Sequence, residues 1–578
     1  MRAEERRDIA CIVVGAIASF FLASVMLSDW PAGLKPNLAH PYIYAGDGLF
    51  QLWLAQRLIE GWIFQNPRSG FPFGSEAFDF PGSDAGNLLV TKALGWLSGT
   101  YYGAFNLYIL LGFAVTFAVT FWVLRRIDVR RGVACVAALL FAFVPYHFYR
   151  LLMGHTFYTW YFVVPVYFYC GWRVYRGALT PRSLLACCAA VAAAACFGVY
   201  FALFGVLTVV LCGLAASARE GTLWPLLLSI ALGVSISIGV LVNVAPNISH
   251  TLTHGKNPEV ARRAPPETEL YSLKLSHLLM PAPDHRVKPL REFAREYATT
   301  FPLSNTVSSV GVVGLFGLLV LAAAFVRSMG GRAVDQRLRL LVLLTAASLL
   351  VATVGGLNVL FATLISPMIR GWDRFSIFIA FYALAGAAVW ASMRWLRAGA
   401  APWVALAVVA VLGLAEQTAG PTLFTSVSKR DHFERDRDLV QKIEAELPRG
   451  AAIYQLPFVQ FPESANTHNL GTYDPLTGFM NSKELRWSSG GMMGRKAAVF
   501  YRALAQKPMA EQLATIKAMG FSGIYVHRAG YADNGAAVVQ EITRLTGNAP
   551  AMNRADGGVS FFKLGDDQRN GNLPNGRL

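Results

Sequence analysis

The sequence predicts an α-helical membrane protein with about eleven transmembrane helices and a small α/β soluble domain at its C-terminal end. Of the 578 residues, 54% are hydrophobic, only 15% are charged, and the mean hydropathy is +0.42. A soluble protein would carry about 25% charged residues. Apolar runs of roughly 17–25 residues, long enough to cross about 30 Å of hydrocarbon, recur over residues 1–416 and are missing from 417–578.

Eleven apolar segments are predicted to cross the membrane. They are residues 9–27, 101–124, 132–150, 157–173, 183–198, 201–218, 223–244, 308–327, 339–355, 374–393 and 402–416. The first lacks a small-residue cleavage site and is followed by Asp29-Trp30-Pro31, so a retained helix is expected rather than a signal peptide. Because the connection at Gly198 is very short, 183–218 could instead be one bent helix, which would reverse everything after it.

The arginines predict the orientation. With eleven spans and a cytoplasmic N-terminus, the basic clusters at 2–7, 125–131, 173–182, 327–339 and 394–397 all fall on one side, as cytoplasmic loops require. The hydrophilic regions 28–100, 245–307 and 417–578 are then extracytoplasmic, which in a bacterium means the outer side of the inner membrane. The net charge of +16 therefore implies no nucleic-acid partner.

The seven cysteines all lie within or at the ends of apolar segments, so neither a disulfide framework nor a zinc site is predicted. In the first outer loop, 28–100, Leu49–Glu60 has the pattern of an amphipathic helix and a second helix is expected near 86–98. Short helices with one apolar face and tryptophan at the edge lie well in the membrane interface, in contact with lipids.

The tail is predicted to fold as a periplasmic α/β domain over 417–565, followed by a disordered end at 566–578. Buried strands are expected at 451–456 and 523–527, and an edge or closing strand at 558–564. Helices are expected at 496–506, 509–519 and 536–545. Alternating strands and helices are typical of a small α/β domain.

Asp47 is the leading candidate for chemistry. It follows the first apolar segment, in Tyr44-Ala-Gly-Asp-Gly-Leu-Phe50. A carboxylate held at the outer membrane surface could accept a proton from an acceptor hydroxyl as a general base. The alternative is that Asp47 caps the N-terminus of the following helix, and the two roles are compatible.

A possible divalent-metal site is the acidic group Glu76, Asp79 and Asp84, because hard cations prefer several carboxylate oxygens. Asp84 could equally cap the helix at 86–98. His155 lies in a Gly-His turn at the second outer loop, among tyrosines. It belongs either to an active-site cup or to an aromatic belt at the interface.

Four cationic side chains near the outer surface could bind a lipid phosphate: His254, Lys256, Arg370 and Arg374. Arginine offers bidentate geometry for phosphate, although Arg374 could instead pair with Asp373. In the tail, Trp487 could stack on a sugar face while Arg486 and Glu463 bond its hydroxyls. A packed domain core explains the same residues equally well.

The order of these features resembles the GT-C glycosyltransferase superfamily, including protein mannosyltransferases and oligosaccharyltransferases. The residues that carry the resemblance are Gly46-Asp47 in the first loop, His155 in the second and Arg374. The tail is similar, at 456–463 and 485–488, to a bacterial branch sometimes labelled sugar translocase or phosphoglycerol transferase. The first loop lacks the Asp-x-Asp or Asp-Glu pair of the better-known families, which leaves metal dependence open.

The resemblance implies a sugar donor linked to a polyprenyl phosphate and an extracytoplasmic glycan or lipid as acceptor. Asp47 would be the general base, Arg374, with His155 or Lys256, would stabilise the departing phosphate, and the tail would help bind the acceptor. One alternative is a flippase for a lipid-linked sugar, although the predicted spans carry almost no charged residues at mid-membrane, where transporters place them. The other is a non-catalytic scaffold for envelope assembly.

Overall fold

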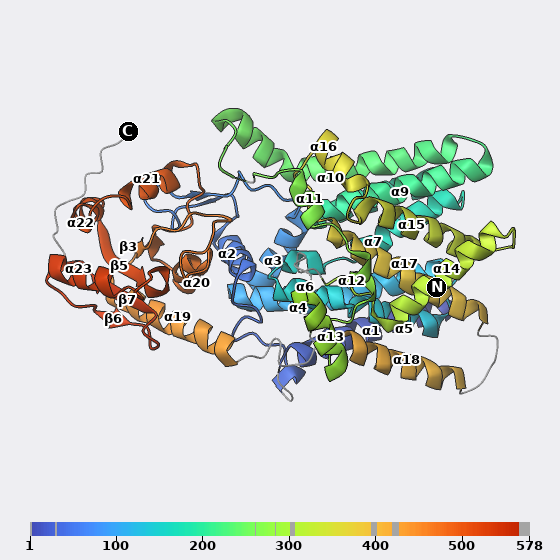
Figure 1. Ribbon diagram of the computed structural model, residues 1–578, viewed down its shortest axis with the longest axis horizontal. Helices are drawn as coiled ribbons and strands as arrows, with labels where there is room; N and C mark the ends of the chain where they lie inside the picture. Colours follow the sequence, from blue (N-terminus) through green and yellow to red (C-terminus); the bar gives the residue numbers. More distant parts are fainter. Residues whose placement is uncertain are drawn as a thin grey trace.

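The computed structural model describes residues 3–28, 32–260, 262–283, 285–300, 307–394, 401–418 and 427–565. A bundle of helices occupies one end of the molecule, and a domain containing a β-sheet occupies the other (Figure 1). Residues Asp29–Pro31, which follow the first apolar segment, and the predicted disordered end at 566–578 lie outside the described residues.

Each of the eleven predicted segments overlaps an apolar helix. These helices are α1 (Ala3–Leu27), α4 (Tyr101–Arg126), α5 and α6 (Arg131–Ala142 and Pro145–Leu152), α7 (Val163–Tyr175), α8 (Pro181–Ala194), α9 (Val199–Glu220), α10 (Trp224–His254), α14 (Gly311–Met329), α15 (Gln336–Ala352), α17 (Ser376–Arg394) and α18 (Ala401–Gln417).

Within the described ranges, seven helical stretches are long and apolar enough to cross a membrane, which confirms a multi-pass membrane protein. They are α1, α4, α5 with α6, α9, α10, α14 and α17 with the turn before it. The four others, α7, α8, α15 and α18, have 13, 14, 17 and 17 residues. The count of eleven crossings and the orientation that depends on it remain predictions.

The structure corrects two boundaries and excludes the alternative of one bent helix over 183–218. The predicted span 132–150 is broken before Pro145, because proline lacks the N–H that a continuous helix would need. Between α8 and α9, a 3-10 turn and Gly198, with φ of 121°, separate two helices rather than bending one. Helix α10 runs on to His254 instead of ending near 244, and Asn247 in this extension donates to the carbonyl of Phe78 at 2.6 Å.

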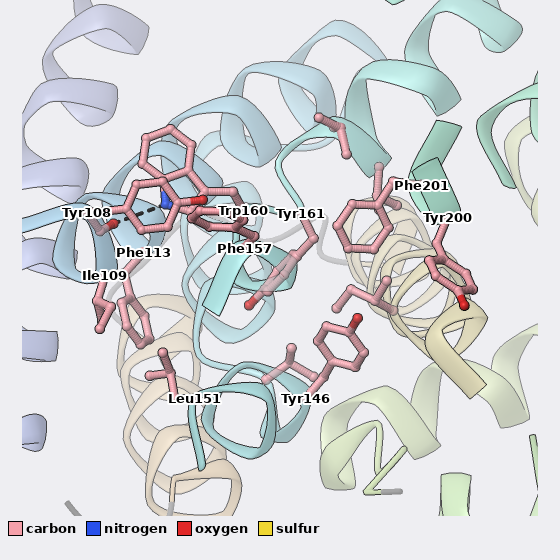
Figure 2. Packing of buried hydrophobic residues seen from close by; sticks show 14 of the residues in the cluster. Tyr108, Ile109, Phe113, Tyr146, Leu151, Phe157, Trp160, Tyr161, Tyr200 and Phe201 are labelled. Carbon is pink, nitrogen blue, oxygen red and sulfur yellow. Dashed lines mark hydrogen bonds between the residues drawn. The ribbon is translucent and has the colours of Figure 1, made fainter. Parts of the chain in front are cut away.

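A buried aromatic core fixes the break between α5 and α6 (Figure 2). The hydroxyl of Tyr161 lies 3.1 and 3.0 Å from the carbonyl oxygens of Phe141 and Ala142, which lie at the end of α5 where the helix breaks. Trp160 stacks on Tyr108 with 4.7 Å between ring centroids, and its indole N–H donates to the Tyr108 carbonyl at 3.0 Å. This packing holds the turn that follows α6 in one place.

The tail contains a five-stranded sheet in the order β4-β3-β5-β7-β6. Strands β4 (Arg486–Trp487), β3 (Ala452–Leu456) and β5 (Phe521–His527) are parallel, whereas β7 (Val559–Lys563) and β6 (Met552–Asn553) are antiparallel. The three predicted strands and the helices α21 (Lys496–Leu504), α22 (Met509–Ala518) and α23 (Ala536–Thr546) are present. The expectation that 558–564 forms an edge is wrong, because β6 pairs with its outer side.

The loop 28–100 and the tail form one packed unit. Helices α2 (Asp47–Glu60) and α3 (Ala85–Ser98) form at the predicted positions, and α2 lies between the tail and the helical bundle (Figure 1). The interfacial placement predicted for α2 is corrected, because Trp53 and Arg57 are both 0% exposed within the protein. The loop segment 68–71 pairs with 487–489, which begins at the last residue of β4, through Trp487 N–H to Arg68 O at 2.6 Å and Phe71 N–H to Trp487 O at 2.9 Å. The tail therefore rests directly on the loop that carries Asp47.

Candidate functional site

Asp47 is the first residue of α2, and its side chain faces His155 from the loop that follows α6. The N-cap position is taken by Gly46, with φ of 51°. The Asp47 carboxylate is 50% exposed, and its Oδ2 lies 2.9 Å from Nε2 of His155. The structure thus assigns the capping position to Gly46 and brings together two predicted site residues 108 positions apart.

The contact between these loops depends on a glycine. Gly154 has φ of +72°, which favours glycine. A Cβ on Gly154 would lie 2.1 Å from the nitrogen of Gly48 and 2.7 Å from the carbonyl carbon of Asp47. Only a residue without a side chain lets the turn carrying His155 approach the N-terminus of α2 this closely.

Arg150, one helical turn before His155, sets the state of the imidazole. Its guanidinium Nη1 lies 3.4 Å from Nδ1 of His155. Since an arginine can only donate, Nδ1 accepts and the ring proton is on Nε2, from which it is donated to Asp47. Burial lowers the pKa of His155 and so do the charges of Arg374 and Arg150, against the raising effect of Asp47. The pair is a neutral imidazole donating to a carboxylate.

Arg150 also forms a buried ion pair with Asp373, the two side chains being 4% and 3% exposed. This pair joins α6 to the turn η4 (Trp372–Phe375) that precedes α17. Asp373 was the alternative partner predicted for Arg374. Because Asp373 is bonded to Arg150 instead, Arg374 is left without it.

Arg374 lies between two tyrosine rings. Its guanidinium carbon is 4.2 Å from the ring centroid of Tyr158 and 4.1 Å from that of Tyr200, and Nη1 donates to the Tyr158 hydroxyl at 3.2 Å. Among the residues the structure describes, no carboxylate oxygen lies within 4.0 Å of this guanidinium, and its Nε is buried without a hydrogen-bond partner. A guanidinium without a carboxylate partner can bind an anion such as phosphate.

Asp84 acts on the same cation at longer range. Burial raises the pKa of Asp84 to about 6, against the lowering effects of its hydrogen bond with Asn87 and of the positive charge of Arg374. Asp84 occupies the N-cap position of α3, but its side chain makes no capping hydrogen bond there. It accepts instead from the Asn87 amide at 2.9 Å.

The three carboxylates of the predicted metal site do not meet. Asp79 forms a two-pronged ion pair with Arg495, with both N–O distances 2.6 Å, and Glu76 lies 3.6 Å from Nε2 of His250. With Asp84 bonded to Asn87, each acid has a different partner. Over the ranges that the structure covers, no group of three or more His, Cys, Asp or Glu side chains is arranged to hold a metal ion. The expectation of a shared site is therefore corrected.

The remaining predicted phosphate ligands lie apart from Arg374. Arg370 forms an ion pair with Glu267 and covers the ring of Tyr271. His254 stacks on His250 with 4.2 Å between ring centroids. Lys256 is exposed on the segment after α10. Of the four predicted cations, Arg374 is the one that the structure brings into the surroundings of His155.

The predicted sugar-binding residues of the tail are not gathered. Trp487 is 0% exposed and its indole N–H donates to Ser482 at 2.8 Å, so both ring faces are packed and the sugar-stacking prediction is wrong. Glu463 pairs with Arg263 at 2.6 Å. Arg486 is exposed and lies over Phe71 at 5.2 Å. For Trp487, the alternative of a packed core holds.

Sequence reasoning did not assign roles to Arg150, Tyr158 and Tyr200. Arg150 carried a usable signal, because it lies at the end of the predicted span 132–150, and a charged residue buried at a span end needs a nearby partner. The tyrosines carried none, because tyrosine is common at membrane interfaces.

Comparison with known proteins supports the fold. No protein-family model and no curated protein match the chain. The structure is similar to that of ArnT from Cupriavidus metallidurans bound to undecaprenyl phosphate, with 16% identity, a TM-score of 0.51, and coverage of 97% of this chain and 98% of ArnT. This likeness confirms the predicted GT-C fold.

Two further solved structures align less closely. The oligosaccharyltransferase AglB from Archaeoglobus fulgidus, in complex with an inhibitory peptide and a dolichol-phosphate, gives 11% identity and a TM-score of 0.44 over 91% of this chain and 70% of AglB. The arabinofuranosyltransferase AftD from Mycobacteria gives 18% and 0.49 over 90% of this chain. The chain spans 35% of the length of AftD.

Proposed function

We propose that this protein is a membrane glycosyltransferase that moves a sugar from a polyprenyl-phosphate-linked donor to an extracytoplasmic glycan or lipid. One observation carries the proposal: the Asp47–His155 pair, at 2.9 Å, lies in the same cluster as Arg374, a cation without an ion-pair partner in the described chain. A general base next to a cation that lacks a carboxylate partner in the described chain is what transfer from a lipid phosphate requires. The GT-C fold, shared with ArnT, supports the same assignment.

In the proposed reaction, an acceptor hydroxyl oxygen attacks the anomeric carbon of the donor. The new bond between carbon and oxygen forms as the bond between that carbon and the phosphate oxygen breaks. Asp47 takes the hydroxyl proton as general base, and the N–H of neutral His155 orients the carboxylate. Arg374 stabilises the negative charge that remains on the polyprenyl phosphate. A single displacement of this kind inverts the anomeric configuration.

The proposed location is the bacterial inner membrane, with the N-terminus cytoplasmic and the tail periplasmic. The arginine distribution supports this orientation. Alkaline phosphatase fused after Leu578 should be active only if the tail is periplasmic, and an inactive but intact fusion would reverse the orientation.

Asp47→Asn tests the enzymatic role. The substitution keeps the shape and removes the basic oxygen, and general bases contribute about 10²–10⁴ to rates. Cell-surface glycans and lipids are compared by mass spectrometry in cells that lack the gene and carry either the wild type or a variant. The matched control is Asp438→Asn, whose carboxylate is 61% exposed on α19 (Val427–Glu446).

We expect the product that depends on the gene to fall at least a hundredfold with Asp47→Asn and to persist with Asp438→Asn, at equal protein levels in the membrane. Persistence of the product in both variants would remove the base role and favour a scaffold. If the protein were a flippase, cells that lack the gene would accumulate the lipid-linked sugar on the cytoplasmic side of the membrane. Asp47→Asn would not cause this accumulation.

A further inference from the structure

The tail contains a small polar cavity that the proposed reaction does not use. It has a volume of about 130 Å³ and lies where β5 ends, bordered by α19 and the loop that leads into the short helix at 477–481. Six of its lining residues carry the argument: His432, Asn469, Asp474, Thr477, His527 and Arg554. Of these residues, the sequence patterns point only to Asp474, as part of a polar–aromatic run in the tail.

Its position in the sheet is one that binds ligands in other α/β proteins. His527 is the last residue of β5, and Gln455, next to the end of the parallel strand β3, lies 3.3 Å from its Nε2. In open α/β sheets, ligands bind in the crevice at the carboxyl ends of parallel strands. The cavity opens at this end of β3 and β5.

The main cation of the cavity is already paired with a carboxylate of the protein. Arg554 is paired with the buried Asp436 at 2.6 Å, and the other oxygen of Asp436 accepts from the hydroxyl of Tyr44 at 3.1 Å. Burial lowers the pKa of His527 to about 3, and the charges of Arg554 and His432 act in the same direction, so its imidazole is neutral. A cavity with a compensated cation and a neutral imidazole does not favour a phosphate or another anion.

Free hydrogen-bonding groups remain beside these pairs. Asp474 accepts the backbone N–H of Gly471 at 2.8 Å with Oδ2, which leaves Oδ1 available. The side-chain amide of Asn469, exposed at the rim, makes no hydrogen bond within the described ranges. The carboxylate of Asp474 and the amide of Asn469 together offer both acceptors and donors, which suits the hydroxyl groups of a sugar.

We propose that this cavity is a subsite for one uncharged sugar residue. It rests on the proposed function in one respect: the sugar would belong to the acceptor glycan. The bond from Asp436 to Tyr44, three residues before Asp47, links the cavity wall to the segment that carries the general base. A sugar bound here would hold the acceptor on the domain that rests on the catalytic loop.

Binding is measured by saturation-transfer difference NMR on the full-length protein in lipid nanodiscs. The probes are methyl glycosides of glucose, galactose and mannose, with glucuronic acid and inorganic phosphate as anionic comparisons. The variants are Asn469→Ala and Asp474→Asn. The control is Asn548→Ala, an exposed residue of the same domain outside the cavity.

We expect at least one neutral glycoside to bind with a millimolar Kd, both cavity variants to weaken it at least fivefold, and Asn548→Ala to leave it unchanged. Asn469 lies at the exposed rim, so a fold defect would not explain its effect, and thermal melting of each variant checks this. No binding of any neutral glycoside, equal binding by all variants, or preferential binding of glucuronic acid or phosphate would overturn the proposal. Asp47→Asn should bind the sugar as the wild type does. Sugar binding by the cavity is therefore tested independently of the transferase assignment.

Discussion

The closest backbone approach in the site gives a quantitative test. In Gly154→Ala, the new Cβ would lie 2.1 Å from the nitrogen of Gly48, about 0.9 Å short of the 3.0 Å that real Cβ atoms respect. Both neighbours are backbone atoms, so the turn carrying His155 must move away from α2 by about this distance. A misplacement of about 1 Å can cost about 10²-fold in rate, because catalytic groups act over a narrow range of geometry.

Gly99→Ala is the matched control for this substitution. Gly99 has φ of +69°, close to the +72° of Gly154, but a Cβ there would meet nothing within 4 Å. Both variants therefore pay the penalty of a left-handed alanine, about 1–2 kcal/mol, and only Gly154→Ala adds the collision. Activity is the amount of gene-dependent product measured by mass spectrometry. Folding of each variant is checked by its melting temperature in detergent. Equal activity of the two variants, with Gly154→Ala folded, would refute the close-approach argument.

Three further outcomes are expected. Arg374→Met should weaken binding of undecaprenyl phosphate, measured by native mass spectrometry, about tenfold or more, because a hydrogen bond to a charged group contributes about 1.5–3 kcal/mol; Arg370→Met, whose cation is paired with Glu267, should not. His527, with a pKa lowered to about 3, stays neutral when folded but takes up a proton when unfolded below about pH 6.5. Stability should therefore fall as the pH drops from 6.5 to 4, by at most about 3 kcal/mol, and His527→Gln should flatten this part of the curve of melting temperature against pH. Trp487→Ala should destabilise the protein by about 3–5 kcal/mol, whereas Arg486→Ala, on the exposed neighbour, should change stability by less than about 0.5 kcal/mol.

The sequence predicted the membrane helices well because lipid leaves the backbone few options. An apolar run that crosses hydrocarbon must satisfy its N–H and C=O groups internally, so hydropathy alone indicates a helix. The tail was less predictable. Strands β4 and β6 have two residues each, too few to show alternation, and β6 is what turns the predicted edge at 558–564 into an inner strand.

The candidate site was predicted in its members but not in its pairings. Asp47 and His155 lie in predicted loops between apolar segments, and Arg374 lies at the start of one, which a linear reading detects. Which charge neutralises which is decided by contacts between distant segments. Asp79 meets Arg495 across 416 residues, and Asp373 meets Arg150 across 223. No local pattern distinguishes a carboxylate free to bind metal from one already held by an arginine.

The pairing of Asp373 with Arg150 determines two properties of the site at once. Asp373 is next to Arg374 in sequence but is paired with Arg150. Arg374 therefore has no carboxylate partner in the described chain and could bind an external anion. The ion pair also fixes Arg150 beside Nδ1 of His155, which places the imidazole proton on the nitrogen that faces Asp47. A buried ion pair is weak evidence for a role in stability, since its desolvation offsets its attraction. Here its position explains it better: the same two charges orient the proposed base and leave the proposed phosphate-binding Arg374 without a carboxylate partner among the described residues.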